Sequence, residues 1–251
     1  MILTSDAGGV RTLTLNRPDK LNAFNDAQFD ALAEAVLDAG TDDSVKVVVL
    51  TGAGRAFSAG ADLSGGRHGD IIRHGFPGCV DVLVDFEKPL LIAVNGLGVG
   101  IGATIVGLAD AAFMAESSRL RCPFSALGLT AEACSTYTFP MLMGRHKASW
   151  FLLSAEWLSA QQCADAGLVA DVLPDEGFLE AVQEKAATLA RLPMSSLRQT
   201  KSLIMAPHRE AMRTAARAEN EGLASLRGGT ANVEAVTAFA EKREPDFSGI
   251  N

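Results

Sequence analysis

Basic residues are scarce in this chain: 22 lysines and arginines stand against 30 aspartates and glutamates, so the formal net charge is −8. A protein that binds nucleic acid needs the opposite charge balance, and we exclude nucleic acid as an expected partner. Cysteine is scarce too, and Cys79, Cys122, Cys134 and Cys163 form no C-x-x-C pair and have no paired histidine. We therefore expect no metal site and interpret the cysteines as packing thiols in a reducing compartment.

Targeting signals are missing from the sequence as well. The first residues lack the basic-then-apolar order of a signal peptide, and the last five, FSGIN, are not a peroxisomal address. The default expectation is a cytoplasmic protein with no membrane partner. A length of 251 residues allows one large domain or one domain with an appendage, and a hydrophobic content of 48% suffices for a sizeable core.

An uncharged stretch over residues 89–109 organises the rest of the chain. It opens as a short apolar run typical of a buried strand, passes through Gly96, Gly98, Gly100 and Gly102, and continues with small residues at helical spacing. Glycines at every second position permit a tight turn and a close approach. A helix that begins just after the turn presents unpaired N–H groups, which can hold an anion or a developing negative charge.

Three other interpretations compete for this stretch. Its length suits a membrane span, but Asn95 and the glycines make a poor lipid-facing helix and no positive flank supports insertion. The spacing Gly98-x-Gly100-x-x-Ala103 resembles a dinucleotide fingerprint, yet it lies in mid-chain, whereas that fingerprint usually opens a domain. Close packing of a strand on a helix, with no functional role, explains the stretch about as well as a binding site does.

Hydrophobic patterning elsewhere indicates alternating strands and helices, hence an α/β protein. Asn25 and Gln28 form a candidate capping pair for a helix that Gly40 ends. We expect residues 64–78, with five glycines and no periodicity, to form a mobile loop, and residues 120–129 to be irregular. Strands are expected over 10–15, 45–51, 89–94 and 111–115, and helices from 131 onward and over 146–154, 160–166, 176–192 and most of 194–243.

Four separated segments together resemble the enoyl-CoA hydratase/isomerase (crotonase) superfamily. They are AFSAGADL (56–63), VNGLGVGIG (94–102), NRPDKLNA (16–23) and ADAGLV (164–169). The resemblance covers nearly the whole chain and removes the dinucleotide interpretation. It implies a crotonase-type α/β spiral of β-β-α turns, with a core and active site over residues 1–193 and a helical trimerisation region over 194–251. It also implies CoA thioester substrates, with no metal or redox cofactor, since CoA is part of the substrate.

The resemblance also implies where the chemistry takes place. Enzymes of this superfamily stabilise a thioester enolate with two backbone N–H groups, here those of Ala61 and Ile101. The two glutamates that hydratases use fall on Thr104 and Phe124, and neither side chain is a general base. Ordinary hydration is therefore disfavoured.

The segment PFSALGLTAEACSTYTFP (123–140) is similar to the Δ3,Δ2-enoyl-CoA isomerases of the peroxisomal type. By this resemblance Glu132 is the catalytic base, and the leading hypothesis is an enoyl-CoA isomerase in the degradation of unsaturated fatty acids. Two alternatives stay open: another crotonase reaction, such as hydration or thioester hydrolysis, and a non-catalytic acyl-CoA-binding module. Without the resemblance, Glu132 would be interpreted as a solvated side chain near the start of a helix, where the helix dipole favours a negative charge.

Further residues are implied as contacts of the CoA portion. A neighbouring subunit would supply the last helix, so the expected assembly is a homotrimer or a dimer of trimers. A basic side chain such as Lys242 near the CoA phosphates is physically reasonable, because it can pair with their negative charge. The residues implied in substrate binding are Lys20, Leu21, Ala23, Ala59, Gly60, Asp62, Leu63, Phe239 and Lys242.

Overall fold

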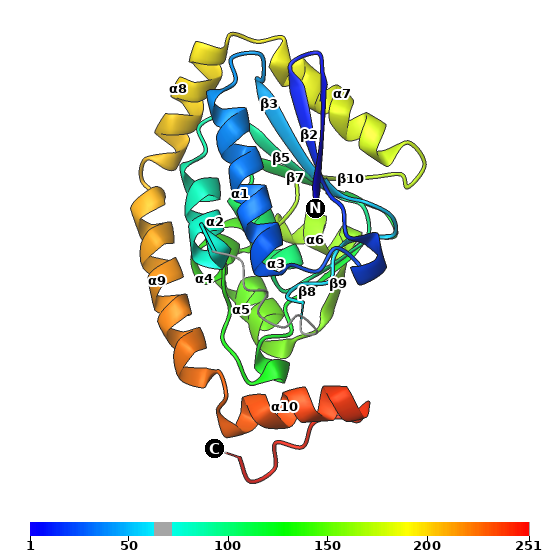
Figure 1. Cartoon of the computed structure of the whole chain (residues 1–251), viewed down its shortest axis with the longest axis vertical. Helices are drawn as coiled ribbons and strands as arrows, with labels where there is room; N and C mark the ends of the chain where they lie inside the picture. The colour runs from blue at the N-terminus through cyan, green and yellow to red at the C-terminus, as the bar shows by residue number, and fades with distance from the viewer. Residues whose placement is uncertain (63–71, 251) are drawn as a thin grey trace.

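The computed structural model describes residues 1–62 and 72–250, and it places ten strands of that part of the chain in two sheets (Figure 1). The larger sheet has the order β1-β2-β3-β5-β7-β10, and all its pairs are parallel except β1 with β2. Its strands are β1 (Ile2–Ala7), β2 (Val10–Leu15), β3 (Val47–Gly52), β5 (Leu90–Val94), β7 (Ala111–Ala115) and β10 (Asp171–Leu173).

The strands of the smaller sheet show that the chain winds as a spiral. After each of three consecutive strands of the large sheet, a turn leads into a short strand of the small sheet, and a helix follows. This repeated β-β-α turn is the crotonase-type architecture that the family resemblance implies. The small sheet contains β4 (Ala56–Ser58), β6 (Leu97–Val99), β8 (Arg119–Arg121) and β9 (Trp157–Ser159), and the helices that follow the first three are α2 (Gly75–Asp85), α3 (Ile101–Thr104) with η2 (Ile105–Leu108), and η3 (Ser125–Leu127).

Alternate residues of the central strands enter two separate cores. Val47 and Val49 of β3 belong to a cluster with helix α7 (Phe178–Ala190), which covers one face of the large sheet. Val48 and Leu50 belong to the main cluster on the other face, which includes α1 (Asp26–Thr41), α2 and the small sheet. A strand with both faces buried reads as a continuous apolar run, as predicted for this segment.

The C-terminal region is helical, as expected, and runs along one side of the body before α10 (Thr230–Glu241) crosses its lower end in Figure 1. Helix α8 (Met194–Met205) is held to the body by Lys201, which is 8% exposed and donates to Asp110 (2.6 Å) and to the Lys88 carbonyl (2.9 Å). None of the described helices has both the length and the apolar character needed to span a bilayer. The remaining helices are α4 (Ser135–Met143), α5 (Arg145–Ser154), α6 (Ala160–Ala166) and α9 (Arg209–Leu226), with the short η1 (Pro18–Lys20) near the N-terminus.

Two details of the first helix differ from the expectation. Gly40 does not end α1, which continues to Thr41: Gly40 is absent from the residues with positive φ, and the C-cap of the helix is Asp42, whose N–H donates to the Asp38 carbonyl. The Asn25 side chain accepts from the Gln28 N–H as predicted (2.9 Å). The Gln28 amide does not complete the pair, and within the described residues it has no hydrogen-bond partner.

Three segments differ in part from the expectation, because their partners are distant in sequence. Residues 75–78, expected in a mobile loop over 64–78, begin α2, and the part of that loop over 64–71 lies outside the described residues. The segment 120–129 is irregular as predicted except at the end of β8, which pairs with β6 and β9, and at the short η3. Residues 131–134 are not helical, since α4 begins at Ser135.

Candidate active site

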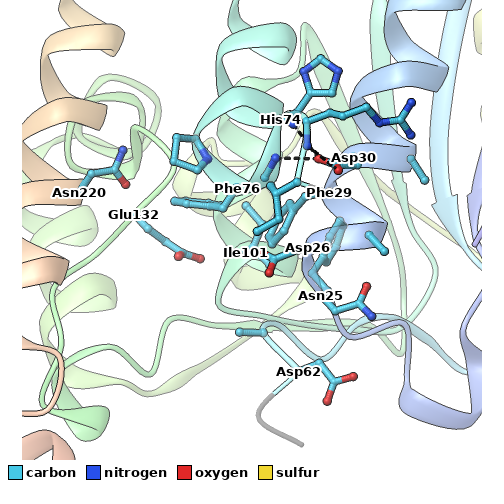
Figure 2. Close-up of a pocket in the computed structure, with 18 of the residues that line it drawn as sticks. Asn25, Asp26, Phe29, Asp30, Asp62, His74, Phe76, Ile101, Glu132 and Asn220 are labelled. Carbon is cyan, nitrogen blue, oxygen red and sulfur yellow. Dashed lines mark hydrogen bonds between the residues drawn. The ribbon is translucent and has the colours of Figure 1, made fainter. Parts of the chain in front are cut away.

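A cavity of about 810 Å³ lies between α1, the start of α2, α9 and the turns that follow β4 and β6 (Figure 2). Its lining includes Ala61, Ile101 and Glu132, the three residues for which the sequence predicts a role in catalysis. They come from three separate turns of the spiral. The fold therefore brings the predicted catalytic groups into one space, which is the first requirement for their acting together.

Ala61 is held by a strand-like pairing between residues 21–24 and 59–62. The Ala59 N–H donates to the Leu21 carbonyl (2.9 Å), the Phe24 N–H to the Gly60 carbonyl (2.7 Å), and the Asp62 N–H to the Phe24 carbonyl (2.8 Å). In such a pairing the N–H of the intervening residue points to the other side. The Ala61 N–H accordingly has no acceptor within residues 1–62 and 72–250.

Ile101 is the first residue of α3, and the turn before it depends on glycine. Gly100 has φ 54° and ψ −122°, its N–H donates to the Arg121 carbonyl (3.0 Å), and its carbonyl accepts from Ala103 and Thr104. A side chain rarely adopts this backbone conformation. The Ile101 N–H is left without an acceptor in the described residues, as expected at a helix start.

The two donor-bearing turns contact each other through glycine. A Cβ built on Gly60 would lie 2.8 Å from the Val99 carbonyl oxygen, and one built on Gly100 would lie 3.8 Å from Gly60 Cα. A Cβ on Gly102 would lie 2.5 Å from the Ser58 carbonyl oxygen. The small residues of both motifs are therefore needed for close packing, and the same packing brings together the two turns that carry Ala61 and Ile101, both of which line the cavity.

Glu132 enters the cavity from the loop between η3 and α4. The two residues after it, Ala133 and Cys134, both have left-handed backbone (φ 56° and 62°), an uncommon pair that turns the chain sharply into α4. A Cβ on Gly100 would lie 4.0 Å from Glu132 Oε1. In Figure 2 the carboxylate points into the cavity, toward the side that holds Ile101. Glu132 thus lies beside the paired turns and does not point into bulk water.

Burial raises the pKa of Glu132 to about 7, and the negative charge of Glu219 adds to this effect while Arg227 opposes it. Desolvation penalises the ionised form of a carboxyl group, and a nearby like charge penalises it again. A carboxyl that titrates near neutrality can both accept and return a proton, which is the property a general base needs when it must also act as the acid.

Three phenylalanines form an apolar wall next to these polar groups. Phe24 stacks on Phe29 with ring centroids 4.7 Å apart, and Phe29 contacts Phe76 edge-on at 5.4 Å. Leu223 of α9 also lines the cavity. The cavity therefore combines a hydrophobic surface suited to an acyl chain with a small number of polar groups at one place.

The predicted substrate-binding residues divide into those near the cavity and those away from it. Asp62 lines it, but its carboxylate accepts from Arg17 (2.7 Å), so its side chain already serves to hold the turn. Leu63 lies outside the described residues. The others lie beside the cavity wall or on the exposed α10 and its end, and do not line the cavity: Lys20, Leu21, Ala23, Ala59, Gly60, Phe239 and Lys242.

Several residues of the site were not found by sequence reasoning. Asp30 of α1 accepts from three backbone N–H groups, those of Arg73 (2.9 Å), His74 (2.8 Å) and Gly75 (2.7 Å), and so caps α2 from a distant element. Glu219 of α9 holds the start of α4 in a similar way. Neither Asp30 nor Glu219 belongs to a local sequence motif. The one signal that could have pointed to them is a carboxylate at a position that the amphipathic pattern of the helix predicts to be buried.

The positions that correspond to the hydratase glutamates carry no ionisable group. Thr104 is fully buried and donates to the Gly100 carbonyl (3.2 Å), and Phe124 is 6% exposed in the core. Within residues 1–62 and 72–250, no cluster of three or more histidine, cysteine, aspartate or glutamate side chains is arranged to hold a metal ion.

Comparison with known proteins identifies the family of this chain. The sequence model described as "Enoyl-CoA hydratase/isomerase" matches residues 5–250. Enoyl-CoA delta isomerase 2 of Rattus norvegicus is 40% identical over 220 residues, which are 83% of this chain and 55% of that protein, so the chain spans about half the length of this relative. The 1,2-epoxyphenylacetyl-CoA isomerase of Escherichia coli K12 is 35% identical over 258 residues, covering 99% of this chain and 98% of that one.

A solved structure gives the same result for the fold. The enoyl-CoA hydratase/isomerase from Pseudoalteromonas atlantica T6c superimposes with a TM-score of 0.92 at 31% identity, and the match covers 98% of this chain and 99% of that one. Since the family match and the structural match both extend over nearly the full length, the chain belongs to the enoyl-CoA hydratase/isomerase family of the crotonase superfamily.

Proposed function

We propose that this protein is a Δ3,Δ2-enoyl-CoA isomerase, which converts a 3-enoyl-CoA to the trans-2-enoyl-CoA. The observation that carries the proposal is one carboxyl group, Glu132, with a pKa of about 7, beside two backbone N–H groups that have no acceptor in the described residues. The similarity to a protein named enoyl-CoA delta isomerase 2 supports the same reaction. A role in the oxidation of unsaturated fatty acids follows from that substrate.

The proposed reaction moves one proton. Glu132 removes a proton from C2 of the 3-enoyl thioester, and the electron pair of the C–H bond delocalises onto the thioester oxygen to give a dienolate. The N–H groups of Ala61 and Ile101 donate to that oxygen as its charge develops, and loss of one such donor typically costs about 3–4 kcal/mol. Glu132, now protonated, returns the proton to C4, and the double bond is left between C2 and C3.

A single carboxyl group is sufficient for this chemistry, whereas hydration also needs a second group that activates water. Thr104 and Phe124 cannot supply one. The isomerisation requires no added cofactor, because the thioester carbonyl itself acidifies the C2 proton and CoA enters as part of the substrate. The proposal includes binding of the CoA portion beside residues 20–23 and 59–63, with Phe239 and Lys242 contributed to a neighbour's site.

The test is a side-by-side assay of 3-hexenoyl-CoA and trans-2-hexenoyl-CoA. We expect formation of the conjugated product from the first, and from the second only partial conversion to the 3-enoyl isomer, with no 3-hydroxyhexanoyl-CoA formed. In Glu132→Gln the turnover number should fall by about 10²–10⁴-fold, the usual contribution of a positioned acid or base. In the wild-type enzyme, kcat/KM should rise as the pH passes through about 7, because the base acts in its ionised form.

Two results would overturn the proposal. Consumption of trans-2-hexenoyl-CoA by hydration would indicate another reaction of the family, with water held by other groups. Tight acyl-CoA binding without turnover of either substrate would indicate a non-catalytic acyl-CoA-binding module. If Glu132→Gln turned over 3-hexenoyl-CoA at nearly the wild-type rate, the assignment of Glu132 as the base would be refuted, but the proposed reaction would not.

A further inference from the structure

The buried carboxylate of Glu219 lies behind the loop that presents Glu132. Glu219 belongs to α9, in the C-terminal helical region, and is 4% exposed. It accepts hydrogen bonds from the Cys134 N–H (2.7 Å), the Thr136 N–H (2.8 Å) and the Thr136 hydroxyl (2.6 Å). All three partners are donors, so the ionised form of Glu219 satisfies them best.

These bonds act on the most constrained part of the backbone near the site. Cys134 is the second of the two left-handed residues after Glu132, and its own side chain does not cap α4. Non-glycine residues persist in this strained conformation only where the surroundings hold them. Glu219 supplies the missing cap from 85 residues away and stabilises the helix start with its negative charge.

We propose that Glu219 is a positioning residue for Glu132: its carboxylate, through its bonds to Cys134 and Thr136, fixes the turn at 133–134 that aims Glu132 into the cavity, and it keeps the two carboxyl groups electrostatically coupled across that turn. This inference rests on the proposed function in that it treats Glu132 as the base. Its physical content, the coupling between the two carboxyl groups, can be measured without turnover.

The charges and the burial around Glu132 and Glu219 shift their pKa values in the direction that electrostatic coupling of the two groups requires. The Glu219 charge raises the pKa of Glu132, and burial raises the pKa of Glu219 itself, opposed by its three donors. Other ionisable groups face Glu132 from several elements. They are Cys122 after β8, Arg227 after α9 and, around the same cavity, Asp26, Asp30, Glu34, Asp62, Arg73 and His74.

The closing experiment is an infrared titration of carboxyl groups in the full-length protein, with the Glu132 band assigned by its loss in Glu132→Gln. In Glu219→Gln the midpoint of the Glu132 band should fall by about half a pH unit or more, because a neighbouring like charge is removed. The matched control is Glu221→Gln, an exposed glutamate on the same helix, for which the midpoint should not move.

If Glu219→Gln does not fold, Glu219→Asp keeps the charge but withdraws it by one methylene group, and the midpoint should move in the same direction by less. An unchanged or raised midpoint in a variant that is folded by circular dichroism would overturn the proposal. Because the titration needs no substrate, it gives this answer whether or not 3-enoyl-CoA is turned over, and a failure of the proposed function is recognised separately by the assay.

Discussion

Gly100 lies directly against the Glu132 carboxyl group: a Cβ on Gly100 would stand 4.0 Å from Glu132 Oε1, and 3.8 Å from Gly60 Cα on the other side. A side chain at position 100 would therefore lie between Glu132, the proposed base, and the turn that carries Gly60. We expect Gly100→Ala to lower kcat/KM by at least about tenfold, because the methyl group competes with the thioester for this space. Steady-state kinetics with 3-hexenoyl-CoA measure the effect.

The matched control for Gly100→Ala is Gly144→Ala. Gly144 also has positive φ (74°), but nothing lies within 4 Å of its ideal Cβ. Both variants should lose stability by about 1–3 kcal/mol from backbone strain, and only Gly100→Ala should lose activity. Equal kinetic losses in the two variants would show that the effect comes from strain and not from the occupied space.

Glu132→Gln should gain stability while it loses activity, and the gain should depend on pH. The pKa of Glu132 is raised from the usual value for glutamate to about 7 in the folded protein, so between these values the folded state binds more protons than the unfolded state. Folding stability contributed by this group is fully present below about pH 4.5 and is lost as the pH rises through about 7. Urea unfolding at pH 8 should show Glu132→Gln to be more stable than wild type by about 1–3 kcal/mol, and at pH 4.5 the difference should disappear.

Wild-type and variant curves that differ by the same amount at both pH values would contradict this prediction. The difference would then come from packing of the amide and not from ionisation. A gain at pH 8 would mean that the fold holds Glu132 at the cost of stability, as expected for a group kept for its chemistry.

The sequence predicted the elements whose signals are local. Val48 and Leu50 lie in a continuous β-branched and apolar run, and the small residues around Gly60 and Gly100 indicate tight turns, so both features were found from composition and spacing. The sequence could not show that residues 21–24 pair with 59–62, because a segment of mixed polarity pairs through its backbone. It could not show that Glu219 reaches the loop after Glu132 either, since the two segments are brought together only by the packing of α9 on α4.

Asp30→Ala should destabilise the wall of the cavity that α2 forms. Asp30 is 6% exposed and accepts three backbone N–H groups at the start of α2, which no side chain of α2 or its N-cap residue satisfies. Its burial acts to raise the pKa, but the three donors outweigh burial and lower it. The stability that Asp30 contributes is therefore present above the pKa that Asp30 has in the unfolded chain. It is lost as the pH falls through the lower pKa that Asp30 has in the folded protein.

We expect Asp30→Ala to lower the free energy of unfolding at pH 7 by about 1–3 kcal/mol and to weaken acyl-CoA binding, because buried donors lose their partner. Calorimetry of unfolding and of binding measures the two effects. Asp43→Asn, at an exposed position just beyond the same helix, is the control and should change neither quantity. If Asp30→Ala binds acyl-CoA as tightly as wild type, then the start of α2 does not shape the acyl site.

Leu203 and Ile204 of α8 are 67% and 60% exposed, and Phe239 of α10 is 68% exposed. Side chains of this size are expensive to leave in water, since each is worth about 1.5–3 kcal/mol when buried. We predict that the protein in solution is a homotrimer or a dimer of trimers that covers them, with a mass by light scattering that is a multiple of three chains. Leu203→Glu should shift the mass toward single chains, because a charge would enter the interface, whereas Ser202→Glu, at an exposed polar position on another face of the same helix, should leave it unchanged. A wild-type protein that stays monomeric at micromolar concentration would mean that these helices meet another partner or none, and the contribution of Phe239 and Lys242 to a neighbour's site would have to be abandoned.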